Sequence, residues 1–361
     1  MSFPLRVEVD RPDAVLVSLS DDWQMIHNQP VNRFEYVTGT HYDNGALQIG
    51  IADLCDSREF SGIVAGASGS GKSQWAMSML LSAAFNTSPE LLTMVICDPK
   101  HVDFAPLMTL PHLAHSGILT EVDDCRAAIM AVLAEMDRRV KAGDRSVMGK
   151  RILLYIDELP DLLMQDDGTI EAALIRLAQK GRAWGINLFV AAQKATSDVI
   201  STKVLANLAV RVVMRVGSFH ESTHVSGQDG CTAHKLPGNG ASLIYNAEHN
   251  GGLRSQTHFV ADADKPNFDR QVGRFVEDVR SRWAGCRPHW RFVAPEPIGK
   301  VVESSSTDDD WPFGFRAAVA ALHESNSSNF SIRAVRRLHQ SMYGSEPRHD
   351  RAKALYDEIL G

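Results

Sequence analysis

The sequence lacks any apolar run that approaches the length of about 18–20 residues needed to cross a bilayer as a helix. Its first residues also lack a basic segment followed by an apolar one, so we expect no secretory signal there. Both absences exclude the simplest routes to the membrane or out of the cell. We therefore expect a cytoplasmic protein without a membrane span.

Cysteine is scarce, and its pattern is not that of a disulfide scaffold. The 361 residues include 5 cysteines, widely spaced and free of any CxxC pair. An odd number at such spacing favours reduced thiols and argues against a zinc site. The 14 histidines show no HExxH or similar spacing, so we do not expect them to be metal ligands.

Basic residues are also fewer than acidic ones. There are 37 Lys and Arg residues against 44 Asp and Glu, a formal net charge of −7. This balance argues against a protein that coats nucleic acid over its whole surface. It does not exclude a basic lining inside a ring, because net charge says little about local fields. The hydrophobic content of 44% is enough for a core of full size in one to three domains.

One glycine-rich segment has a clear chemical meaning. It reads Gly66-Ala67-Ser68-Gly69-Ser70-Gly71-Lys72-Ser73, after the apolar run 62–65 and before a helix-forming run that starts at Gln74. This is the spacing of a phosphate-binding P-loop, in which backbone N–H groups at a helix N-terminus turn toward a polyphosphate. We expect residues 66–74 to bind nucleotide, with Lys72 on the β- and γ-phosphates and the Ser73 hydroxyl on Mg²⁺. The alternative is a glycine-rich turn that binds nothing.

Further apolar runs alternate with helical patterns along the chain. We expect strands at 92–97, 152–156, 186–192, 210–216, 241–245 and 257–260. Helices are expected after Ser73 to about Asn86, from Val122 to about 141, across 170–180 and over 268–283. In the second of these, we expect the buried stripe to be Ala127, Met130, Leu133, Met136 and Val140. Such alternation predicts an α/β fold with a parallel sheet and crossover helices.

Polar residues follow three of the expected strands and are candidates for chemistry. Asp98, the pair Asp157 and Glu158, and Gln193 all stand where a strand ends. Because the carboxyl ends of parallel strands share one edge, we expect them to meet the P-loop there. ATP hydrolysis needs a metal, an oriented water and a positive group. We expect Asp157 to hold Mg²⁺ opposite Ser73. We expect Glu158 to face the cleft and polarise the attacking water, and Gln193 to contact the γ-phosphate. The competing interpretation is a set of strand ends that meet solvent.

These motifs together resemble the motor domain of the FtsK/SpoIIIE family of bacterial DNA translocases, over about residues 46–262. Beside the P-loop, the blocks that carry the resemblance are Asp98-Pro99-Lys100, Pro111-His112-Leu113, Ile156-Asp157-Glu158-Leu159 and Arg176-Leu177-Ala178-Gln179-Lys180-Gly181-Arg182-Ala183. The resemblance implies a RecA-like P-loop NTPase core with a mostly parallel sheet. It also implies a hexameric ring that uses ATP and Mg²⁺ to move double-stranded DNA through its channel.

The resemblance further implies an arginine that acts across the subunit interface. Arg182 and Arg215 are the matching candidates, and either could instead be a surface ion-pair residue. The sequence departs from the family at Lys194-Ala195-Thr196 and Gly240-Ala241-Ser242, in regions that carry DNA-facing loops in the family. We therefore do not predict which residues grip DNA. The absence of the large members' membrane spans predicts a free-standing motor, such as one from a plasmid, phage or mobile element.

Composition divides the chain into four parts. We expect a small N-terminal lobe over 1–45, the ATPase motor over 46–286, a linker rich in Pro, Ser and Asp over 287–311, and a small helical or winged-helix-like domain over 312–361. Two other functions stay open beside DNA translocation. One is a related ring ATPase that drives protein secretion, and the other is a nucleotide-binding regulatory protein with negligible turnover.

Overall fold

The computed structural model describes residues 17–27, 31–43, 46–100, 103–143, 147, 149–262 and 265–292, with single residues and pairs beyond 318. The chain divides into two compact units, Met1–Ala294 and Pro295–Gly361. Residues 1–16 of the predicted N-terminal lobe, the predicted linker beyond Phe292 and most of the predicted C-terminal domain lie outside the described residues.

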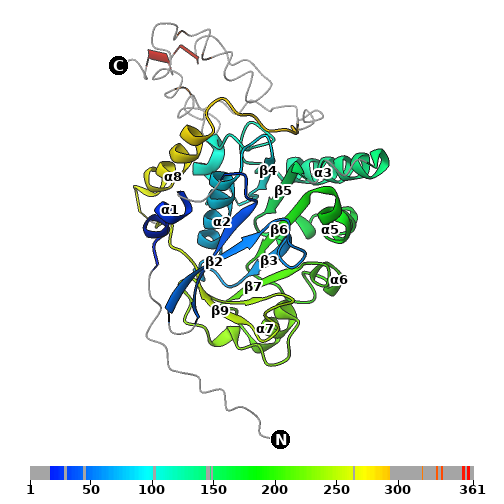
Figure 1. The fold of residues 1–361 in the computed structure, drawn as a ribbon. Coiled ribbons are helices and arrows are strands. Elements are labelled where there is room, and N and C mark those ends of the chain that lie inside the picture. The colour runs from blue at the N-terminus through cyan, green and yellow to red at the C-terminus, as the bar shows by residue number, and fades with distance from the viewer. Residues whose placement is uncertain are drawn as a thin grey trace, which may run out of the picture. The chain divides into compact units, whose positions relative to one another are not determined.

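A nine-stranded sheet runs through the first unit in the order β2-β1-β9-β8-β7-β3-β6-β5-β4 (Figure 1). Five neighbouring strands are parallel: β7 (Val210–Met214), β3 (Ser61–Ala65), β6 (Ile186–Ala192), β5 (Arg151–Ile156) and β4 (Leu92–Cys97). The other four continue the sheet antiparallel: β8 (Ala241–Tyr245), β9 (Leu253–Gln256), β1 (Glu35–Asp43) and β2 (Ala46–Asp53). The expected α/β fold with a RecA-like core is confirmed.

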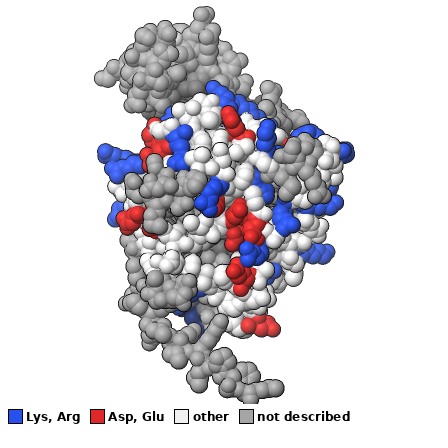
Figure 2. All heavy atoms as spheres, in the orientation of Figure 1, with Lys and Arg blue, Asp and Glu red and all other residues white. Residues whose placement is uncertain are grey.

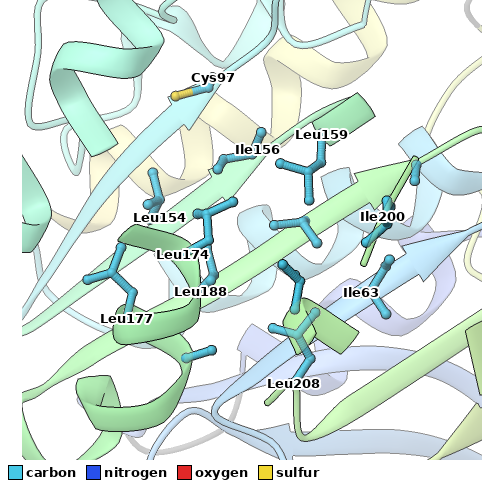
Figure 3. Close-up of a cluster of buried hydrophobic side chains, with 14 of the residues drawn as sticks. Ile63, Cys97, Leu154, Ile156, Leu159, Leu174, Leu177, Leu188, Ile200 and Leu208 are labelled. Atoms are coloured by element: carbon cyan, nitrogen blue, oxygen red, sulfur yellow. The ribbon is translucent and has the colours of Figure 1, made fainter. Parts of the chain in front are cut away.

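Helices cover both faces of this sheet, because its central strands are apolar on both sides. One face packs against α1 (Leu19–His27), α2 (Lys72–Asn86) and α8 (Phe268–Arg282). The other packs mainly against α3 (Val122–Ala142) and α5 (Thr169–Lys180), with the short helices α4 (Leu159–Leu163), α6 (Thr202–Leu205) and α7 (Phe219–Ser226) beside them. Figure 3 shows this second core, where Leu174 and Leu177 of α5 lie against Leu154 and Leu188 of the sheet.

The described residues before β2 belong to the main sheet and its helices. Strand β1 pairs with both β2 and β9. Helix α1 packs on α2 and α8, and its Trp23 Nε1 donates a hydrogen bond to Asp278 at 2.9 Å. No helix in the described parts of the chain is long and apolar enough to cross a membrane.

Two local predictions were wrong. The predicted strand 257–260 is replaced by β9 at Leu253–Gln256, and Phe259 forms only an isolated bridge with Ser18. The predicted buried stripe of α3 was misplaced in part, since Met130 and Val140 are 37% and 39% exposed. The buried face instead centres on neighbours such as Ile129. The helix is apolar over more than one stripe, so only the packing partner selects the buried one.

Candidate functional site

The P-loop joins the end of β3 to the start of α2, as its sequence predicts. Gly69 and Gly71 both adopt positive φ angles, of 71° and 108°. Gly71 also lies against the chain at Gly240, where an added Cβ would stand 2.8 Å from backbone atoms. Gly240 N–H donates to Ser70 O at 2.8 Å. The turn therefore depends on glycine both for its dihedral angles and for its close approach to a second segment.

A substitution pair tests this dependence. Gly71→Ala is expected to lower the free energy of unfolding more than Gly69→Ala does. Both pay about 1–2 kcal/mol for a side chain at positive φ. Only Gly71→Ala also meets the backbone of Gly240, which adds about 1–3 kcal/mol of overpacking. Urea unfolding without nucleotide measures both, and equal losses would contradict the close packing.

A cavity of about 780 Å³ lies over the P-loop. Loop and helix residues from 68 to 74 form one wall, and residues from 256 to 262 form another. Lys100, Asp103, Asp157 and Gln193 reach it from the ends of β4, β5 and β6. The expected edge of the sheet thus gathers the P-loop, Asp157 and Gln193 around one hollow, whereas Asp98 is buried and is not among the described residues that line it.

The two walls are joined through Gln74. Its side-chain Nε2 donates to Ala261 O at 2.7 Å, and its Oε1 accepts from Val260 N–H at 2.7 Å. This bridge fixes the segment after β9 against the first turn of α2. A direct contact of Gln74 with nucleotide stays a prediction.

Lys72 lines the cavity, is buried and contacts the P-loop itself. Its Nζ donates to Gly66 O at 2.7 Å and to Ala67 O at 3.3 Å. Burial lowers the pKa of its ammonium group, while the negative charges of Glu158 and Asp157 oppose that change. The ammonium group of Lys72 thus has neutral carbonyl oxygens as partners. Its hydrogen bonds to the charged oxygens of a phosphate would be stronger.

The hydroxyl of Ser73, the predicted Mg²⁺ ligand, has a side-chain partner. Its hydroxyl donates to the carboxylate of Asp103, a residue on the segment after β4 that sequence reasoning did not select. Asp157, which is predicted to hold Mg²⁺ opposite Ser73, lines the same cavity and accepts a hydrogen bond from Tyr155 Oη at 2.9 Å. Asp103 is five residues beyond Asp98, in a loop whose path the sequence does not predict. No sequence pattern therefore indicated that its carboxylate would reach Ser73.

Several carboxylates crowd this side of the cavity. The pKa of the Asp157 carboxyl is raised to about 7, mainly by burial and also by the negative charges of Asp98, Glu158 and Asp103. The hydrogen bond from Tyr155 acts in the opposite direction. Such repulsion is relieved by a divalent cation. The hard oxygen donors present, one hydroxyl and the carboxylates of Asp103 and Asp157, fit Mg²⁺, which usually takes one or two carboxylates beside phosphate oxygens.

Glu158 does not face the cleft as predicted. Among the described residues that line the cavity, Asp157 is present and Glu158 is not. Glu158 is buried. Its backbone is in the left-handed region, with a φ angle of 53°, so its side chain does not follow the direction of the Asp157 side chain. Its Oε1 accepts Gln193 N–H at 3.0 Å, and its Oε2 pairs with Lys100 Nζ at 2.9 Å. The sequence therefore located the residue correctly at the strand end, but not the direction of its carboxylate.

The structure separates the two candidate arginines. Arg215 follows β7 and lies beside the P-loop of its own chain, since its carbonyl accepts Ala67 N–H at 2.7 Å. Its guanidinium donates to Pro237 O at 3.3 Å. Arg182 precedes β6, so it lies at the amino edge of the parallel strands, opposite the P-loop. There it is exposed. The pKa of Asp56 is lowered to about 2 mainly by its hydrogen bonds with Arg58, and the charge of Arg182 adds a smaller lowering.

Comparison with known proteins assigns this arrangement to a family. Residues 45–144 match the FtsK/SpoIIIE family model. The chain is 34% identical over 289 residues to the DNA translocase SftA of Bacillus subtilis (strain 168), covering 75% of this chain and 29% of that protein. The chain carries a P-loop ATPase domain of the FtsK/SpoIIIE family. It is also 27% identical over 349 residues to the DNA translocase FtsK of Oceanobacillus iheyensis, covering 90% of this chain and 42% of that protein.

This FtsK/SpoIIIE-family chain spans about a third of the length of the curated relatives that it matches. Solved structures share its fold. The Thermomonospora curvata EccC ATPases 2 and 3, in complex with a signal sequence peptide, give a TM-score of 0.62 at 20% identity, covering 74% of this chain and 50% of that one. The pCW3 conjugation coupling protein TcpA, a monomer form with ATPγS, gives 0.56 at 23% identity, covering 71% and 73%.

Proposed function

We propose that this domain binds ATP with Mg²⁺, hydrolyses it and uses the energy to translocate double-stranded DNA. The observation that carries the proposal is the convergence of Lys72, Ser73, Asp157 and Gln193 on one cavity over the P-loop. The names of the relatives, which are DNA translocases, support DNA as the substrate.

Each residue has a role in this proposal that follows from its place. Lys72 leaves the carbonyls of the P-loop to hold the β- and γ-phosphates, and Gln193 contacts the terminal phosphate. Ser73 and Asp157 hold Mg²⁺, with Asp103 able to exchange its hydrogen bond for the ion or its water. The ion supplies neutralisation of phosphate charge. Glu158 orients the attacking water after it is released from its present partners.

Charge at the two edges of the sheet supports assembly into a ring. Exposed basic side chains gather at the amino edge, near the carboxyl ends of α3 and α5, and Figure 2 shows Lys and Arg atoms over this side of the molecule. They are Arg138, Lys141, Lys150, Arg176, Lys180 and Arg182. The opposite edge carries the acidic residues of the site. Contact between unlike edges of successive copies is head-to-tail, and such contacts close into rings when the rotation allows. A hexamer is the closure that the family resemblance implies.

The rate of ATP hydrolysis with and without double-stranded DNA tests the function. We expect turnover that rises several-fold on addition of a linear duplex. Turnover that DNA does not change would favour protein secretion, and nucleotide binding without turnover would favour a regulatory protein. A duplex of scrambled sequence is the control for sequence preference.

The salt dependence of DNA binding gives a second test. Because phosphate contacts release counterions, we expect duplex affinity to fall by about 10³-fold or more between 50 and 200 mM salt if six or more phosphates are contacted. Fluorescence anisotropy of a labelled duplex measures this. A flat dependence would contradict a basic DNA channel in this otherwise acidic chain.

A further inference from the structure

Lys100 occupies a position that the proposed function does not yet use. Of the described residues that line the cavity, two are lysines, Lys72 and Lys100. Lys100 follows Asp98 and Pro99 at the end of β4, and its side chain is 30% exposed. Lys72 has backbone partners, whereas the ammonium group of Lys100 pairs with acidic side chains.

The stronger of these pairs involves the carboxylate of Glu158. Lys100 Nζ lies 2.9 Å from Glu158 Oε2 and 3.9 Å from Asp161 Oδ2. Glu158 is only 5% exposed in its side chain, and its other oxygen holds Gln193 N–H at 3.0 Å. Lys100 therefore stands between the cavity, which it lines, and the carboxylate, which does not reach that cavity.

We propose that Lys100 is a positioning residue that exchanges Glu158 for the terminal phosphate of a bound nucleoside triphosphate. This inference rests on the proposed function and adds a way in which the bound nucleotide controls hydrolysis. Lysine is a point charge on a flexible four-carbon stem, so one ammonium group can serve either anion after rotation of its side chain. A γ-phosphate carries more negative charge than a carboxylate and presents three oxygens in the cavity that Lys100 lines. A bound triphosphate thus draws Lys100 away and frees Glu158.

The exchange makes hydrolysis depend on the length of the phosphate chain. A diphosphate lacks the group that competes for Lys100, so Lys100 stays on Glu158 when ADP is bound. The carboxylate is then free only while a triphosphate is present. Gln193 takes part in the same rearrangement, because its backbone N–H is bonded to the other oxygen of Glu158.

Nucleotide binding by single variants is the first test. We expect Lys100→Met to weaken ATPγS binding at least ten-fold and to change ADP binding by less than two-fold, as measured by calorimetric titration. Glu158→Gln removes the competing charge, so it is expected to tighten ATPγS binding several-fold and to leave ADP unchanged. Lys203→Met, at an exposed lysine of α6 away from the cavity, is the matched control and should change neither. Equal weakening of both nucleotides by Lys100→Met would overturn the proposal.

A double-mutant cycle on unfolding gives the second test, without reference to turnover. Lys100→Met and Glu158→Gln are combined, and their coupling in urea unfolding is measured alone, with ADP and with ATPγS. We expect coupling in the free and ADP-bound protein and its loss with ATPγS. Coupling that persists with ATPγS would make the pair purely structural.

Two comparisons distinguish a wrong role for Lys100 from a folding defect and from a failure of the proposed function. Lys100→Met leaves Glu158 buried without its partner and could impair folding, so the same titrations compare Glu158→Gln with the double variant, in which no charge is stranded. There, too, the loss of Lys100 should affect ATPγS and not ADP. If the unaltered protein binds no nucleotide, the proposed function fails and this inference fails with it. If it binds and hydrolyses ATP but the variants do not discriminate, only the role of Lys100 is wrong.

Discussion

Glu158→Gln is expected to lower ATP hydrolysis by about 10²–10⁴-fold, the usual contribution of a positioned general base. Glutamine keeps the length of the side chain and an oxygen that can accept Gln193 N–H, so the fold around β5 should persist. It removes the charge that polarises the attacking water. ATP binding should be retained or tightened, because the P-loop and Lys72 are unchanged.

The measurement is phosphate release at saturating ATP, with binding followed separately by titration. Glu277→Gln is a suitable control, since that glutamate is exposed on α8 and pairs with its helix neighbours Arg280 and Ser281. It should leave both quantities unchanged. Full turnover by Glu158→Gln would show that another group activates the water, and Asp103 would then be the first candidate, because it lines the cavity beside Ser73.

Arg182→Ala is expected to lower hydrolysis by about 10³–10⁵-fold in the assembled protein, the range for an arginine that stabilises the transition state of phosphoryl transfer. We propose this residue, rather than Arg215, for a role across an interface. Arg182 lies at the edge of the sheet opposite its own P-loop, so within an assembly it can reach only the site of a neighbour. Arg215 already contacts its own loop.

Mixing inactive variants gives the decisive measurement. Arg182→Ala supplies an intact P-loop and Lys72→Ala supplies an intact Arg182, so a mixture of the two should regain activity that neither has alone. The mixture of Arg215→Ala with Lys72→Ala should not. Arg176→Ala, at an exposed arginine of α5 paired with Asp137, controls for loss of surface charge. No recovery in the first mixture would place Arg182 outside the neighbour's site.

The sequence by itself determined the parts of this protein that depend on short stretches of chain. The P-loop, strands β4, β6 and β8 and the buried face of α5 follow from local spacing, because glycine positions and apolar periodicity act within a few residues. The convergence of Asp157 and Gln193 with the P-loop also followed, since parallel strands bring their carboxyl ends to one edge.

Only the tertiary structure decided which groups touch. The pair between Lys100 and Glu158, the hydrogen bond from Ser73 to Asp103 and the wall formed by residues 256–262 join segments 30 to 187 residues apart in the chain. The direction of the Glu158 carboxylate depends on a φ angle of 53°, which the neighbouring residues in the sequence do not predict. The fold also decides that Arg182 lies at the amino edge of the parallel strands and that Arg215 lies beside the P-loop. Side-chain direction and long-range contact are set by packing of the whole unit, so no local pattern could specify them.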